Sequence, residues 1–287
     1  MSLVINTNVS SLNAQRHLQA SRNDLETAME RLSSGKRINS AMEDAAGLTI
    51  AHSLETKIKS LETAARNAND AISLIHLAEG AMDAVSSMLV RMRELATQAL
   101  NGTYSATDRG NLNKEFIQLK AEITRISTNT LFNGISVIGN TGSLTFQIGH
   151  KATDTVTLAT KNMSADQIGA TTSGGNTVLA SLNVAVLENS NGTTDAAKAL
   201  DSVDQALSDV DAYRVDMGAV ANRLDHSVEN LYSRIEQQTA AMSRIQDADF
   251  AAETSNLTKA QILSQAATAM LAQANASKQS VLSLLQG

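Results

Sequence analysis

The sequence predicts a mainly α-helical protein, with a long antiparallel helical bundle or coiled coil, a terminal two-helix coiled-coil domain and a small β-hairpin patch at mid-chain. Three observations support this fold class. No proline interrupts the 287 residues, so helices can run long. Apolar residues recur at alternating spacings of three and four in both arms of the chain. The middle, 140–194, is instead rich in Thr and Ser and poor in charge.

The N-terminal arm contains several apolar seams in succession. The first comprises Ala14, Leu18, Ser21, Leu25, Ala28 and Leu32. It stops at Gly35, and we interpret this residue as part of a loop that breaks the helix. Further seams cover 54–75, 82–99 and 112–126, with a change of register near Gly80. Asn101-Gly102 predicts the end of one helix, and Ser105 with Asp108 predicts the cap of the next.

The middle of the chain predicts strands. Residues 144–148 and 155–158 alternate polar and apolar side chains, which indicates an antiparallel hairpin, and 177–187 is another extended stretch. The hydroxyl-rich segment is interpreted either as a polar surface loop or as a surface that carries O-linked sugars. The candidate acceptors are Thr171, Thr172, Ser173, Ser181, Ser190 and Thr193.

The C-terminal arm has the longest seam, from Leu200 to Ile245, which only Arg214 and Gln238 interrupt. Asp247-Ala248-Asp249 then predicts a solvated joint and the start of another helix. The last seam comprises Ala260, Leu263, Ala267, Met270, Ala274, Ser277, Val281 and Leu284.

Burial dictates how these seams pair. The seams of 48–129 and 196–245 can bury one another as an antiparallel bundle. The two terminal seams can pair only with each other, outside that bundle. Because they are rich in Ala and Ser, such a pair is marginal alone and becomes stable when many copies pack side by side. The sequence therefore predicts a subunit whose termini are completed by its neighbours.

Composition argues against several classes of function. There is no Cys, which removes disulfides, thiolate metal sites and cysteine nucleophiles. The net charge of −6 and the 2% of aromatic residues argue against nucleic-acid binding. None of the five histidines has a paired-ligand motif, and no GxSxG or GxGxxG occurs, so we expect no enzyme, no metal and no cofactor. The chain has no secretory signal pattern and no stretch near the roughly 18 apolar residues of a membrane span.

Several long blocks resemble bacterial flagellin. They are INTNVSSLNAQRHL (5–18), LSSGKRINSAMEDAAGLTIA (32–51), NDAISLIHLAEGAMDAVSSMLVRMRELATQALNGT (69–103), LFNG (131–134) and SRIQDADFAAETSNLTKAQILSQAATAMLAQANASKQSVLSLLQ (243–286). The resemblance covers the chain except for about 150–195. The short insert implies a form without large outer domains.

The resemblance implies an extracellular subunit of the flagellar filament. Residues 1–46 and 246–287 would form a terminal coiled-coil domain lining the channel, 47–150 and 195–245 a helical middle domain with a hairpin, and 151–194 a variable insert. The monomer would be exported unfolded and would meet an export chaperone, a cap protein and hook-associated junction proteins. The assembly residues would be Leu18, Leu25, Leu32, Leu263, Ala267, Met270, Ala274, Val281 and Leu284.

The same family likeness implies recognition by Toll-like receptor 5. The matching residues are Arg91 and Leu95 in the block LVRMREL, with Glu115 on the next helix. Three alternatives to the filament subunit stay open. They are a hook–filament junction protein, a flagellin with a catalytic insert, and a cytosolic coiled-coil adaptor.

Overall fold

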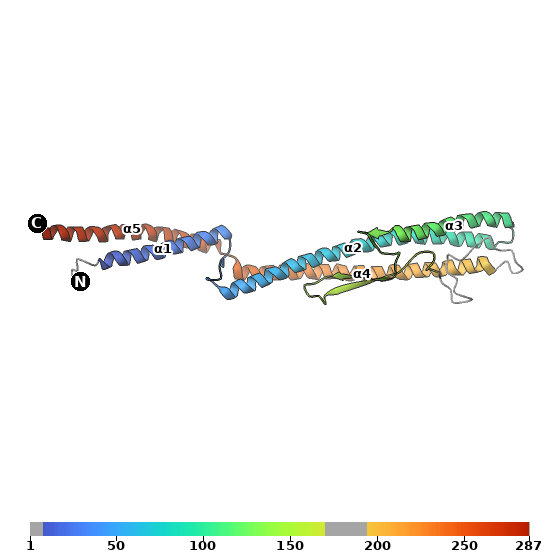
Figure 1. Cartoon of the computed structure of the whole chain (residues 1–287), viewed down its shortest axis with the longest axis horizontal. Coiled ribbons are helices and arrows are strands. Elements are labelled where there is room, and N and C mark those ends of the chain that lie inside the picture. Colours follow the sequence, from blue (N-terminus) through green and yellow to red (C-terminus); the bar gives the residue numbers. More distant parts are fainter. Residues whose placement is uncertain (1–7, 170–193, 287) are drawn as a thin grey trace. The chain divides into compact units, whose positions relative to one another are not determined.

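The computed structural model describes residues 8–169 and 194–286, without the side chains of 194–195 and 278–286. Its helices are α1 (Val9–Ser34), α2 (Ala45–Leu100), α3 (Ala106–Asn129), α4 (Thr194–Gln246) and α5 (Phe250–Gln286) (Figure 1). The strands are β1 (Leu131–Phe132), β2 (Ile135–Ser136), β3 (Gly142–Gln147) and β4 (Thr155–Thr160). The predicted fold class, mainly helical with a small β patch, is confirmed.

The chain divides into two compact units. One comprises 1–58 with 236–287, and the other comprises 59–235. We call them the terminal unit and the middle unit.

The helix ends follow the predicted signals. Ser105 and Asp108 form a reciprocal capping box at the start of α3. Gly35 ends α1 with φ of +69°, a left-handed conformation that glycine adopts without strain. The Asp249 carboxylate accepts from the backbone N–H of Ala251 at 2.9 Å, and so caps α5. The local chemistry of the predicted joints is therefore present in the structure.

The middle unit has one large core, beside a smaller cluster formed by Leu61, Ala64, Ala65 and Leu231. Side chains of α2, α3 and α4 meet in the large core with residues from the strands and the following loop. Its largest fully buried members include Tyr213, Phe116, Met82, Leu89 and Met92. The Tyr213 hydroxyl donates to the Val137 carbonyl at 3.2 Å, which satisfies the one polar group of this buried ring.

The hairpin packs on that core by one face. Strands β3 and β4 pair antiparallel, with Phe146 opposite Val156. On β4, Val156 and Leu158 are buried while Thr157 is exposed, as the alternation predicted. The predicted stretch 177–187 lies outside the described residues. Sequence reasoning missed the short β1–β2 hairpin, although its Asn-Gly turn was a usable signal.

Arg214, which interrupts the long seam of α4, is paired across the bundle. Its guanidinium lies 3.6 Å from the Asp83 carboxylate and 4.0 Å from that of Glu79, both on α2. A charged residue at a seam position is tolerated because its end reaches solvent and opposite charge. The register change predicted near Gly80 does not break the helix, since α2 runs through it.

We predict that Leu89→Ala destabilises the middle unit by roughly 2–5 kcal/mol, because it leaves a cavity in a close-packed core. Leu77→Ala on the same helix is the control, since Leu77 is 41% exposed, and should cost less than about 1 kcal/mol. Urea unfolding followed by circular dichroism measures both. Equal losses for the two variants would contradict this placement of the core.

Candidate assembly surface

Helices α1 and α5 form an antiparallel pair within the terminal unit (Figure 1). At one end, the Asn8 side chain donates to the Ala274 carbonyl at 3.2 Å and also caps α1 through Ser11. At the other end, the Arg31 guanidinium donates to the Glu253 carboxylate at 3.2 Å. The start of α1 therefore lies beside Ala274 of α5, and the start of α5 lies beside the end of α1.

Apart from Glu253, the buried side chains described on these two helices are small. The buried residues are Ser11, Ser21 and Ala28 on α1, and Glu253, Ala260 and Ala267 on α5. Small side chains let helix backbones approach closely, but they remove little apolar surface from water. The pair therefore gains little hydrophobic free energy from its own interface.

The predicted seam of α1 lies in this interface, because Leu18, Leu25 and Leu32 are partly buried. The predicted seam of α5 is correct at Ala260, Ala267 and Ala274.

At the intermediate positions the prediction that this seam faces α1 is wrong, whereas the assembly role predicted for Leu263 and Met270 stays a prediction. Leu263 and Met270 are exposed, and Leu257, Ser264 and Leu271 are partly buried in their place. Apolar residues flank the alanine stripe on both sides, so their spacing could not decide which flank faces α1. The predicted Val281 and Leu284 belong to the part of α5 whose side chains are not described.

The terminal unit instead exposes many large apolar side chains. They are Val9, Leu12, Met29, Met42, Ile50, Phe250, Ile262, Leu263 and Met270. The exposed fraction reaches 64% for Met270 and 98% for Met42. Exposed apolar surface rimmed by polar residues marks a surface that another protein covers.

An ion-pair cluster fastens the joint that precedes α2. Arg31 donates to Glu43 in the joint at 3.0 Å as well as to Glu253 on α5. Glu43 also accepts from the Asn39 backbone N–H at 2.8 Å. The backbone N–H of Arg37 donates to the Gln246 carbonyl, and that of Ala248 donates to the Gly35 carbonyl. One guanidinium thus connects three segments of the terminal unit.

The pKa of Glu43 lies below its ordinary value of 4.5. The main cause is the hydrogen bond from the Asn39 N–H; burial acts in the opposite direction, and Arg31 lowers the pKa further. Because the folded-state pKa is depressed, the contribution of Glu43 to stability is complete above pH 4.5 and is lost as the pH falls below it.

The predicted receptor residues have different environments. Arg91 is exposed on α2 and pairs with Glu115 of α3 at 2.9 Å and with Glu94 at 2.8 Å. The hydrogen bond that Arg91 donates to the Glu115 carboxylate is the main reason why the pKa of Arg91 is raised. Leu95 has no exposed surface, because it packs in the middle-unit core. The prediction of Leu95 as a contact residue therefore has to be corrected, since it offers no area to a partner.

The described residues contain no feature of a metal site or a membrane span. No group of three or more His, Asp or Glu side chains in 8–169 and 194–286 could hold a metal ion. Within the same ranges, no helix combines the length and hydropathy of a membrane-crossing segment. All five histidines are exposed. The predicted sugar acceptors between 171 and 193 lie outside the described residues.

Comparison with known proteins gives a consistent answer over the whole length. The chain matches the bacterial flagellin N-terminal helical region over residues 5–145 and the C-terminal helical region over 200–285. It is 41% identical over 285 residues to the flagellin of Halalkalibacterium halodurans, covering 99% of this chain and 100% of the relative. It is also 41% identical over 302 residues to a Bacillus subtilis flagellin, covering 98% and 99%.

A solved structure of a putative flagellar hook-associated protein from Vibrio parahaemolyticus resembles this chain in fold. The TM-score is 0.58 at 16% identity, over 71% of this chain and all of the other. At that identity the likeness concerns the fold alone.

A helical chain that leaves several large apolar side chains of its terminal pair exposed has a surface typical of structural proteins that associate. The sequence matches over the full length of the chain identify the family of this protein. The chain belongs to the bacterial flagellins, in the short form without large outer domains, and is a structural component of the flagellar filament.

We predict that Arg31→Ala loosens the joint without unfolding the middle unit. Amide hydrogen exchange of residues 36–44 and 250–256 should rise about tenfold at pH 7, as expected for the loss of charge-assisted hydrogen bonds. The control is Arg22→Ala, because Arg22 is exposed on the same helix. This variant should leave the hydrogen exchange of both segments unchanged.

The same joint should open in the wild-type protein as the pH falls below 4.5. Glu43→Gln should remove part of that pH dependence. If exchange in Arg31→Ala matches the wild type at pH 7, the cluster does not hold the joint.

Proposed function

We propose that this flagellin polymerises by burying the exposed apolar side chains of its α1–α5 pair against neighbouring copies. The observation that supports this is the distribution of side chains: small residues and partly buried leucines occupy the interface of the pair, while Ile262, Leu263 and Met270 stay exposed on α5. A free pair of this kind has too little buried area to offset its chain entropy. Assembly supplies the missing area, so the terminal helices gain order as they enter the filament.

The proposed domains follow from this mechanism. Residues 1–46 and 246–287 form the coiled-coil domain that lines the filament channel. Residues 47–150 and 195–245 form the helical middle domain outside it. The segment 151–194 is the variable surface insert, with its predicted sugar acceptors.

The proposed route to the filament is export of the unfolded chain through the growing flagellum, followed by folding at the tip beneath a cap protein. Before export, the apolar flank of α5 needs a cover, and we assign this role to an export chaperone. Hook-associated junction proteins contact the first subunits. The absence of proline and cysteine suits rapid folding at the tip, because neither isomerisation nor disulfide formation delays it.

We predict that Leu263→Glu with Met270→Glu blocks polymerisation but leaves the monomer folded, since both side chains are already exposed. Without the burial of these two side chains, the free energy of adding a subunit to the filament becomes about 3 kcal/mol less favourable. The critical concentration for polymerisation therefore rises roughly 100-fold. Sedimentation after seeding with filament fragments at high sulfate measures this, since sulfate strengthens apolar burial.

Gln261→Glu with Gln265→Glu adds the same charge to α5 and is the matched control. Deletion of 247–287 provides the non-polymerising reference. If the wild-type protein stays monomeric or dimeric under these conditions, the hook–filament junction protein becomes the better assignment. Filaments of the Leu263/Met270 variant at normal concentration would refute the proposed packing surface.

A second proposal concerns Toll-like receptor 5. The exposed face formed by Arg91, Glu94 and Glu115 is the candidate contact, with Leu95 supporting it from below. We expect Arg91→Ala to weaken receptor binding about tenfold, as for removal of one partner of a charge pair at an interface. Arg125→Ala, which breaks another exposed ion pair on α3, is the control in a binding assay with the purified receptor ectodomain. Equal affinities of Arg91→Ala and wild type would remove this face from the proposal.

A further inference from the structure

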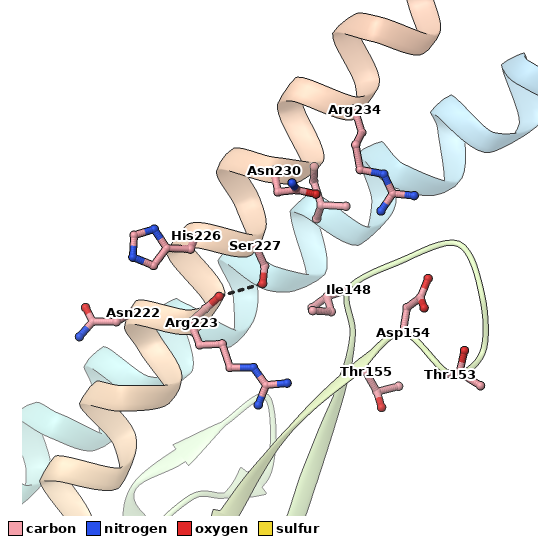
Figure 2. A pocket seen from close by; sticks show the side chains of 11 residues that line it. Ile148, Thr153, Asp154, Thr155, Asn222, Arg223, His226, Ser227, Asn230 and Arg234 are labelled. Carbon is pink, nitrogen blue, oxygen red and sulfur yellow. Dashed lines mark hydrogen bonds between the residues drawn. The ribbon is translucent and has the colours of Figure 1, made fainter.

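A cleft of about 710 Å³ lies between the tip of the β3–β4 hairpin and α4, within the middle unit (Figure 2). Ile148, Thr153 and Asp154 line it from the hairpin side. Its other wall is the stretch of α4 from Asn222 to Arg234. The hairpin turn that forms the tip is held by its own hydrogen bonds, including that from the Lys151 N–H to the Asp154 carboxylate at 3.3 Å. The cleft therefore has two ordered walls.

Two arginines line this cleft from one face of α4. Arg223 and Arg234 are eleven residues apart, which is about three helical turns and about 16 Å along the axis. Figure 2 shows both side chains directed toward the hairpin, with Ser227 between them. The helix therefore presents two cations to the same opening.

Neither guanidinium has a hydrogen-bond or ion-pair partner among the described residues. This distinguishes the two from the other arginines of the middle unit, each of which has at least one partner. Those are Arg66, Arg91, Arg93, Arg109, Arg125 and Arg214. The acid that lines the cleft, Asp154, is engaged by the Lys151 N–H and lies 4.0 Å from His150. With two arginines and one aspartate, the cleft lining carries a net positive charge on a chain of net charge −6.

The opposite end of α4 carries the complementary charge. Asp201 and Asp211 are exposed, and neither has a partner among the described residues. They are ten residues apart, which is about 15 Å along the helix. Their separation along the helix axis therefore matches that of the two arginines to within one residue of helical rise, while around the axis the aspartates stand about 80° apart and the arginines about 20°.

We propose that the cleft of one copy binds the Asp201–Asp211 stretch of a second copy, with each aspartate paired to one arginine. This inference rests on the proposed filament role. The two surfaces lie at different ends of the same helix, so the contact is heterologous and each copy can bind one neighbour at each end. Heterologous contacts that do not close into a ring generate open helical polymers. The charge pairs select the register of this contact and exclude alternatives that bring like charges together.

Charge reversal tests the pairing. Arg223→Glu with Arg234→Glu should raise the critical concentration for seeded polymerisation about tenfold or more, and so should Asp201→Lys with Asp211→Lys. An equimolar mixture of the two variants should polymerise near the wild-type concentration, because each charge-reversed cleft then meets a charge-reversed stretch. A single chain with all four substitutions should recover in the same way. Circular dichroism confirms that each variant keeps the fold of the middle unit.

Arg66→Glu with Arg125→Glu makes the same change of net charge outside the cleft and is the control. The pairing is overturned if the arginine variant polymerises at the wild-type critical concentration, or if the control variant raises that concentration as much as the arginine variant does. It is also overturned if polymerisation is restored neither in the mixture nor in the chain with four substitutions. Failure of the wild-type protein itself to polymerise would instead overturn the filament proposal on which the pairing rests.

Discussion

The small size of the side chains between α1 and α5 is the constraint on which the rest of the molecule depends. Serine and alanine at the centre of that interface let the helices approach closely, but leave the pair with little apolar area to bury. The large side chains, such as Met270 and Ile262, lie outside, where only another molecule can cover them. A terminal unit of this composition leaves apolar area uncovered in a single copy, and we propose that covering this area drives association.

The middle unit has the opposite character. Tyr213, Phe116 and several Met and Leu side chains fill a continuous core, and the hairpin covers part of it. This unit can hold its fold before assembly and can present charged surfaces in fixed positions. In the proposed mechanism, its exposed charges set register and selectivity, while the terminal unit contributes the free energy of assembly. The ion-pair cluster around Arg31 holds the joint at which the terminal pair begins.

Sequence alone predicted most of the fold, because each signal was local. The 3,4 spacing, the Ser105–Asp108 box and Gly35 each act within one or two helical turns, and all lie where predicted. The failures concern which neighbour a side chain faces. Spacing could not show that Leu263 turns away from α1, since apolar residues flank both sides of the alanine stripe. Nor could it show that Leu95 packs inward, or that Arg223 and Arg234 meet the hairpin tip, because tertiary packing brings those residues together.

The pairing of Arg91 with Glu115 has an evolutionary consequence. Each residue satisfies the charge of the other on the exposed face of the middle unit, so replacing one leaves an unbalanced charge on the neighbouring helix. A lineage selected for a different surface here must replace Arg91 and Glu115 together, because replacing only one of them weakens the contact between α2 and α3. Leu95 allows even less freedom, because it serves the core. Covariation of positions 91 and 115 across flagellins is the trace that such selection would leave.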